Sequence, residues 1–250
     1  MKKFLSLLLA AALLFAALLT FSSCGRRISY EESEKYSAGA FETDEKITAI
    51  EIYWDGNYVS VGGAYTANTT VEEDYFKEDA RALRYLVEDG VLKIYPCESG
   101  KGLGKTNKSL FVTLPMDVAT GLKSVKITAA DETKVVLQML KVDNLTVSSE
   151  DGNVRCDGTY KEVSVKTEKG SLTLTSPEIT NLNFTSDIGS ANLSLHMQGF
   201  MAVMQNEKGT FDTTYEISED SGIYTYGTQD SLLTFNTAGI VHLEDVSITG

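Results

Sequence analysis

Acidic residues recur at nearly constant spacing in the second half of the chain, and each lies three residues past the end of a strand-like apolar segment. If those segments stack, their carboxylates would form a ladder with about 4.8 Å between neighbours. Such a ladder could bind Ca²⁺, which takes several oxygen ligands. Acidic residues are also common at turns, so a solvated turn edge is the alternative. The candidate metal ligands are Glu150, Glu168, Asp187 and Glu207.

A glycine-rich stretch, Ser99 to Thr106, resembles a phosphate-binding loop that follows a strand-like segment, Val91 to Tyr95. However, Ser99 stands where the first glycine of that motif belongs. The segment that follows, Leu110 to Leu114, is typical of a strand rather than of the helix whose N-terminus would bind phosphate. We therefore expect a flexible basic loop here, without a bound nucleotide.

The sequence shows no residue pattern that favours another kind of catalytic site. The two histidines, His196 and His242, both lie in strand-like contexts, which favours surface positions over a Ser–His–Asp triad. Two histidines are also too few for most zinc sites. Glycoside cleavage needs a positioned pair of carboxylates, and nothing singles out a pair among the 35 acidic residues. The sequence therefore predicts a protein that is not an enzyme and carries no cofactor.

The N-terminus has the features of an export signal. Lys2 and Lys3 precede an apolar run, Phe4 to Phe21, and two serines then lead to Cys24. We expect residues 1–23 to be a lipoprotein signal peptide and Cys24 to receive the lipid after cleavage. A retained transmembrane anchor and an ordinary cleaved signal are the alternatives, because the run is about long enough to span a bilayer.

Composition limits the partners of the exported chain. Without Lys2 and Lys3, 20 basic residues face 35 acidic ones, which gives a mature charge of −15. This balance argues against nucleic acid and against an anionic membrane surface as binding partners. Residues 24–46 are polar, and we expect them to form a lipidated N-terminus and a flexible tether about 25 Å long.

Two further cysteines, Cys97 and Cys156, follow the signal region. Export would permit a disulfide between them. Cys156 occupies an apolar position of the repeat described below, which favours two buried free thiols. Both states remain open at this point.

Residues 47–95 show two hairpin signals. Alternating apolar residues flank Asp55-Gly56-Asn57, and Leu83 to Val87 and Val91 to Tyr95 flank Glu88-Asp89-Gly90. Between them, Val71 to Arg81 is acidic and fits either a short helix or a loop.

From Leu110 onward the pattern becomes periodic, with intervals of 18 to 20 residues between the ends of successive apolar strands, at Ile127, Val147, Val165, Phe184 and Met204. A second position follows nine residues later, at Val136, Cys156, Leu174, Leu193 and Thr213, and four of these five residues are core-compatible. A third apolar position recurs at Leu140, Tyr160, Met197 and Ile217. Glycines stand five residues after four of the strand ends, at Gly152, Gly170, Gly189 and Gly209.

A fixed period near 19 residues with three apolar positions is typical of an all-β β-solenoid, in which stacked coils share one core. We expect the glycines to mark corners that require a positive φ. The strands after Gly222 and Gly239 would continue the stack or cap it. The alternative is an antiparallel sandwich of hairpins, with turns at Asp151-Gly152 and Lys169-Gly170.

These residues carry a family resemblance. The segment from Leu83 to Ile94, the strand Leu110 to Pro115 and the repeated units of strand, glycine corner and strand resemble the bacterial putative-adhesin family of unknown function. The resemblance covers about Ile47 to Leu243 and implies a β-helical domain, here residues 47–250, in an exported or membrane-tethered protein. The family has no established catalytic residues to carry over.

The sequence therefore predicts a lipoprotein anchored to the outward side of the bacterial cell membrane by Cys24. Its non-enzymatic domain would act in adhesion or envelope recognition, with an unidentified protein or glycan as partner. One alternative is a polysaccharide-active β-helix enzyme. The other is a structural or sensory partner of another envelope protein, whose mark would be an exposed apolar patch around Phe200 to Met204.

Overall fold

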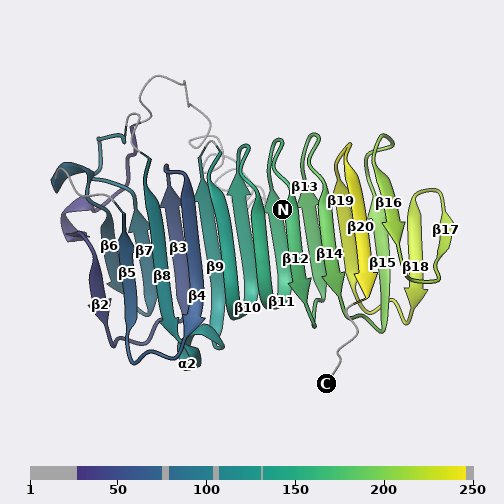
Figure 1. Cartoon of the computed structure of the whole chain (residues 1–250), viewed down its shortest axis with the longest axis horizontal. Helices are drawn as coiled ribbons and strands as arrows, with labels where there is room; N and C mark the ends of the chain where they lie inside the picture. The colour runs from purple at the N-terminus through teal and green to yellow at the C-terminus, as the bar shows by residue number, and fades with distance from the viewer. Residues whose placement is uncertain (1–26, 75–78, 104–106, 131, 246–250) are drawn as a thin grey trace, which may run out of the picture.

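The structure, a computed structural model, describes residues 27–74, 79–103, 107–130 and 132–245 (Figure 1). The expected signal peptide, residues 1–23, and Cys24 lie outside these ranges. Within them the chain is almost entirely β, as the sequence predicts. No helix in these ranges has the length and apolarity needed to cross a bilayer.

The first half of the described chain contains β1 (Ser37–Ala38), β2 (Phe41–Thr43), β3 (Ala49–Trp54), β4 (Tyr58–Ala64), β5 (Thr69–Glu73), β6 (Arg84–Glu88), β7 (Val91–Tyr95), β8 (Ser109–Pro115) and β9 (Leu122–Ala129), with the short helices η1 (Ser33–Lys35), η2 (Asp79–Arg81) and α2 (Met116–Ala119). The second half contains β10 (Lys134–Ser149), β11 (Val154–Lys166), β12 (Leu172–Ser176), β13 (Asn181–Thr185), β14 (Ala191–Leu195), β15 (Gly199–Met204), β16 (Thr210–Thr213), β17 (Ser218–Asp220), β18 (Ile223–Gly227), β19 (Leu232–Asn236) and β20 (Ile240–Asp245).

The strands form two ladders of parallel strands, which we call face A and face B. Face A runs in the order β7, β3, β9, the second half of β10, the second half of β11, β13, β19 and β15. Face B runs β8, β4, the first half of β10, the first half of β11, β12, β14, β20 and β16. One strand from each face makes one repeat. The antiparallel sandwich is therefore wrong for these ladders.

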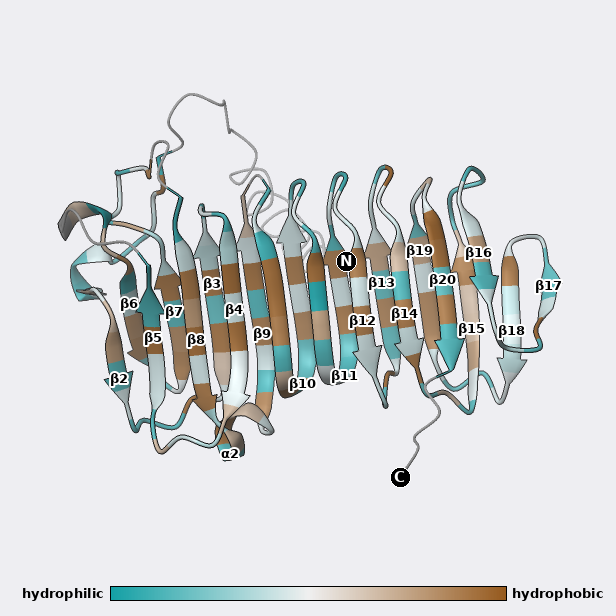
Figure 2. Cartoon of the chain, in the orientation of Figure 1, coloured by the Kyte–Doolittle hydropathy of each residue, from teal (hydrophilic) through white to brown (hydrophobic). Residues whose placement is uncertain are grey.

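Alternation of apolar and polar residues along the strands creates the core. On face A one inward row joins Ile127, Val147, Val165, Phe184 and Phe235 across five neighbouring strands, and all five are buried. The same alternation gives apolar bands at matching heights in adjacent strands (Figure 2). Burial of such rows is the main favourable contribution to folding.

The second and third apolar positions are partly shifted from the predicted ones. Cys156 pairs with Leu137 rather than Val136, and Tyr160 pairs with Val142 rather than Leu140. The Cys156 pairing is shifted because ten residue steps separate Ile127 from Leu137, whereas nine separate Val147 from Cys156. A bulge between Gln138 and Leu140 adds a second residue to β10 where that strand passes from face B to face A, which completes the shift at Tyr160.

Only one of the two predicted hairpins is present. β6 and β7 pair antiparallel through Asp89 and Gly90, which both have positive φ values, of 52° and 75°. The hairpin at Asp55-Gly56-Asn57 is wrong, because β3 lies on face A and β4 on face B. The segment Val71 to Arg81 contains the end of β5 and helix η2, and its residues 75–78 lie outside the described ranges.

The order of repeats along the stack differs from their order in the sequence. At one end β3 and β4 lie between β7/β8 and β9/β10. At the other end β19 and β20 lie between β13/β14 and β15/β16, so the last described strands continue the stack inside it rather than at its tip. Antiparallel strands complete the two ends, with β2, β5, β6 and β1 at one and β18 and β17 at the other (Figure 1).

The expected tether is wrong from Ile28 onward. Ile28 is buried and forms an antiparallel bridge to Lys101, β1 pairs with β6, and β2 pairs with β5. Phe41 also stacks on Tyr85 with ring centroids 3.6 Å apart. A few aromatic and aliphatic residues among many polar ones are sufficient to dock this segment on the domain.

Candidate functional site

Three of the four predicted metal ligands lie in directly neighbouring corners of the stack. The backbone N–H of Glu168 donates to the carbonyl of Glu150 at 2.6 Å, and that of Asp187 donates to the carbonyl of Glu168 at 2.8 Å. The next position in this ladder is Ala238, whose N–H donates to the carbonyl of Asp187 at 3.2 Å. Glu207 is therefore not the neighbour of Asp187, because the intercalated β19/β20 repeat lies between them.

The recurring acidic residues belong to a recurring corner. In each corner a buried hydroxyl residue precedes the glycine by three positions, and the acidic residue lies between them. The Thr167 hydroxyl donates to the Gly170 carbonyl at 2.7 Å, and the Gly189 N–H donates to the Ser186 hydroxyl at 2.8 Å. Among the described residues no group of three or more His, Cys, Asp or Glu side chains is placed to hold a metal ion.

The corner glycines do not have the positive φ that we expected. Gly152, Gly170 and Gly189 are absent from the positive-φ residues of the described chain. They are instead required by close approach, since a Cβ on Gly170 would lie 2.0 Å from the carbonyl oxygen of Gly152. Successive repeats are too close at this edge for any side chain.

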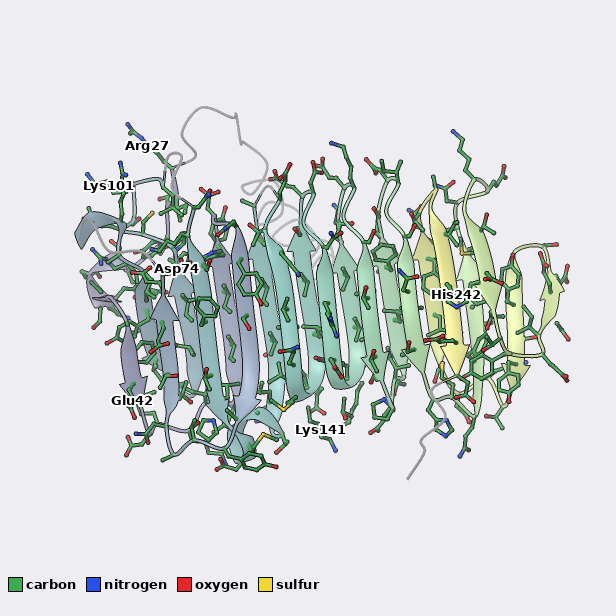
Figure 3. All side chains as sticks on the ribbon, viewed as in Figure 1. Arg27, Glu42, Asp74, Lys101, Lys141 and His242 are labelled. Carbon is green, nitrogen blue, oxygen red and sulfur yellow. The ribbon has the colours of Figure 1, made fainter. Side chains whose placement is uncertain are left out.

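His242 lies in β20, near the C-terminal end of the stack (Figure 3), and His196 directly follows β14. His242 Nδ1 is 2.9 Å from Asp212 Oδ2, and His196 Nδ1 is 3.2 Å from Asp245 Oδ1. The Ser194 hydroxyl donates to Glu244 at 2.6 Å, and no described serine hydroxyl bonds to either histidine. The described residues therefore form no Ser–His–Asp triad, in line with the surface positions expected for both histidines.

The described part of the glycine-rich loop holds the N-terminal segment. Ser99 Oγ accepts the N–H of Tyr30 and donates to the Tyr30 carbonyl, each at 3.2 Å. The segment that follows the loop is strand β8, as predicted, so no helix N-terminus faces it. Residues 104–106 of the loop lie outside the described ranges.

A polar hollow of about 410 Å³ lies on the outer side of face A, over β10, β11, β13 and β19. One row across it joins Asn144, Glu162, Asn181 and the exposed apolar residue Leu232, and the next joins Thr146, Ser164, Asn183 and Thr234. Gln205, just past β15, also lines it. The hollow therefore offers amide and hydroxyl groups at strand spacing, with Glu162 as the single carboxylate of its lining.

The model of one protein family, Toastrack DUF4097, matches residues 47–221. The chain belongs to the Toastrack DUF4097 family. The predicted relationship to the putative adhesins is thereby confirmed. No curated protein matches the chain in sequence.

Solved structures similar to this toastrack protein include three from bacteria. A putative cell adhesion protein from Clostridium sporogenes is 13% identical with a TM-score of 0.45, over 84% of this chain and 100% of the other. A putative adhesin from Bacteroides fragilis is 10% identical with a TM-score of 0.35, over 83% and 96%. A putative lipid binding protein from Parabacteroides distasonis is 11% identical with a TM-score of 0.28, over 89% and 100%.

The sequence prediction missed the polar hollow of the toastrack domain. A signal for part of it was available, because Asn144, Glu162 and Asn181 stand beside apolar residues that the period had already aligned. Thr234 could not be placed with them, because nothing in the spacing shows that β19 inserts next to β13.

The exposed apolar patch expected for a sensory partner is not found around Phe200 to Met204. These residues form β15, in which Phe200 and Ala202 are fully buried. Phe200 packs against Tyr215 and Tyr226 with ring centroids 5.3 Å and 5.7 Å away. The aromatic and methionine residues of this region form the core and cap of the C-terminal end.

Proposed function

We propose that this toastrack protein is a surface lipoprotein, anchored by Cys24 to the outward side of the cell membrane, that acts by binding rather than by catalysis. We further propose that its parallel ladders form one β-solenoid, with the first and last coils intercalated. Adhesion to, or recognition of, a component of the cell envelope is the function that fits best. The observation that carries this proposal is the polar hollow on face A.

Apart from the exposed Leu232, the side chains that line the hollow favour a neutral, hydroxyl-rich ligand such as a glycan. Asn, Thr, Ser and Gln side chains supply both donors and acceptors in regular rows, which suits a chain of sugar hydroxyls. A strongly charged ligand would meet only the single carboxylate of Glu162. Without aromatic residues in the lining, binding would depend on many hydrogen bonds of modest energy.

The enzyme alternative has less support. Hydrolysis of a glycosidic bond by the common mechanisms uses two carboxyl groups on opposite sides of the scissile bond. Glu162 has no second carboxylate beside it in the hollow lining. The hollow therefore fits retention of a glycan better than its cleavage.

A glycan array and whole cells, probed with the chain from Cys24 onward, test the binding function. Asn183→Lys places a charged side chain in the middle of the hollow, and we expect binding to weaken on the order of tenfold. Asn192→Lys is the matched control, because Asn192 is an equally exposed asparagine in a strand of face B. Equal losses in both variants, or binding to proteins but to no glycan, would contradict the glycan assignment.

Metabolic labelling with palmitate tests the anchor separately. We expect the label to enter the protein and to disappear in Cys24→Ala. Labelling that persists in the variant would show that the lipid is attached elsewhere or that the label reports another modification.

A further inference from the structure

The docked N-terminal segment fixes where the domain would meet its anchor. The Ile28 N–H donates to the Lys101 carbonyl at 2.8 Å, and the Gly100 N–H donates to the Ile28 carbonyl at 2.7 Å. Ile28 is 3% exposed and packs with Cys97 and Leu103, while Tyr30 stacks on Tyr95 at 4.0 Å. The chain is thus held in place from Ile28 onward.

The remaining distance to Cys24 is short. Four residue steps separate Cys24 from Ile28, and a fully extended chain covers at most about 14 Å over that length. The polar headgroup layer on each side of a bilayer is itself roughly 5–8 Å thick. A domain joined to Cys24 by a flexible tether that ended only at residue 46 could stand well clear of the membrane, but one held at Ile28 must lie close to the headgroups.

The part of the surface brought to the membrane carries two exposed basic side chains. We call residues 27–30 and 98–103 the anchor corner. Arg27 and Lys101 are both exposed in it and lie at the same corner of the molecule (Figure 3). Its one acidic residue, Glu98, has a carboxylate oxygen 3.9 Å from Nη2 of Arg84. Glu31 and Glu32 are exposed directly beyond the corner, and Glu32 forms an ion pair with Lys35 at 2.9 Å. The anchor corner itself contrasts with the whole sequence, whose net charge is −13.

We infer that the anchor corner is a membrane-contact surface, at which Arg27 and Lys101 bind the headgroups of anionic phospholipids. The inference rests on the proposed lipid anchor at Cys24. Basic side chains are attracted to anionic lipid within a Debye length of the surface, whereas the acidic remainder of the domain is repelled. The two effects together orient the domain, with the anchor corner toward the bilayer.

Energy transfer from Trp54 to headgroup-labelled lipid tests this orientation. Trp54 is the single tryptophan of the chain and lies in β3, in the same end of the stack as the anchor corner. The chain from Cys24 onward is coupled through Cys24 to maleimide-bearing lipid, since Cys97 and Cys156 are buried. The vesicles contain dansyl-labelled phosphatidylethanolamine in phosphatidylcholine, with or without phosphatidylglycerol.

We expect more transfer on vesicles that contain phosphatidylglycerol than on neutral ones. Arg27→Glu/Lys101→Glu should lose this excess, whereas Lys141→Glu, a charge reversal at an exposed lysine on another edge, should retain it (Figure 3). A flexible glycine–serine insert after Gly25 should lower transfer on both kinds of vesicle.

The same measurements can overturn the inference. It is wrong if the original chain shows no excess on anionic vesicles, or if the double variant and Lys141→Glu lose it equally. Chemical coupling makes this result independent of lipidation in cells, so failed palmitate labelling would refute the proposed anchor without altering the vesicle outcome.

Discussion

At the scale of single residues, Lys108 is a buried cation that joins separate segments of the chain. Its Nζ donates to the Arg81 carbonyl at 2.7 Å and to the Pro96 carbonyl at 2.5 Å, and it forms an ion pair with Glu73. It also lies 5.2 Å from the ring centroid of Trp54. Burial lowers the pKa of Lys108, and the Glu73 carboxylate opposes that change.

We expect Lys108→Met to destabilise the fold by about 3–5 kcal/mol, because the substitution removes the cation that pairs with the 6% exposed Glu73 side chain. Urea denaturation measures the change in unfolding free energy. Glu73→Gln/Lys108→Met should be less destabilised than Lys108→Met alone, and exposed Lys141→Met should change little. A similar small effect for Lys108→Met and Lys141→Met would show that the buried pair does not stabilise this end.

Because both thiols are buried, we expect the unfolding free energy to depend on pH in the alkaline range. Burial raises the pKa of Cys97 to about 11 and that of Cys156 to about 12, from an ordinary value of 9.0. Above pH 9 the unfolded thiols lose protons that the folded ones keep, so the unfolding free energy falls as pH rises from 9 to 11. The fall should be smaller in Cys156→Val.

Thiol labelling gives an independent measurement of the same burial. In Cys24→Ala, both remaining cysteines should resist maleimide in the folded state and react in urea. Rapid labelling of the folded protein would contradict the burial of both thiols. It would also remove the selectivity on which coupling through Cys24 depends.

At the scale of elements, the corner between the faces determines how closely repeats can stack. A hydroxyl side chain closes the turns at Gly170 and Gly189, and the glycine permits the next repeat to approach. A Cβ on Gly170 would lie 2.0 Å from a backbone oxygen, whereas one on Gly62 in β4 would lie 3.5 Å from its nearest neighbour, an ordinary contact. Spacing between backbones, rather than turn conformation, selects glycine here.

We expect Gly170→Ala to destabilise the fold by about 1–3 kcal/mol, since the neighbouring backbone must move. Gly62→Ala should be neutral or slightly stabilising, because alanine restricts the unfolded chain more than glycine does. Thermal and urea denaturation of both variants give the comparison. If the two substitutions behaved alike, close approach would not explain the corner glycines.

The sequence predicts the positions of the strands better than it predicts which strands pair. Alternation identified the inward residues, and the period aligned Val147, Val165 and Phe184, which do neighbour one another. Spacing gives no information on whether two adjacent strands pair or lie on opposite faces, and β3 and β4 were wrongly expected to pair for this reason. The hollow was missed because its polar residues belong to outward rows, which carry no burial signal.

At the scale of the whole molecule, both ends of the stack are completed by segments from within the chain. β7 and β8 lie outside β3 and β4, and β15 and β16 lie outside β19 and β20 (Figure 1). Short antiparallel strands then form the outer edges. Short or irregular edges discourage the end-to-end pairing to which an open parallel ladder is prone.

The repeat formed by β19 and β20 lies between two other repeats. Its removal should therefore destabilise strands that precede it in the sequence. We expect a chain ended after Asp230 to lose β19 and β20 and with them the buried Phe235 and Leu243. β13 and β14 would then lose their neighbours on one side, and β15 would keep only its pairing with β18. Phe184 and Leu193, buried in the intact chain, would become exposed at a new end.

Hydrogen exchange followed by mass spectrometry can localise that loss. Protection should fall across residues 181–213, which all precede the truncation, and a chain ended after Asp245 should retain it because it keeps every described pairing. A stack in sequence order would predict the opposite, since removal of its last strands would leave β13 to β16 intact. Unchanged protection of residues 181–213 in the chain ended after Asp230 would therefore refute the intercalated order of the C-terminal repeats.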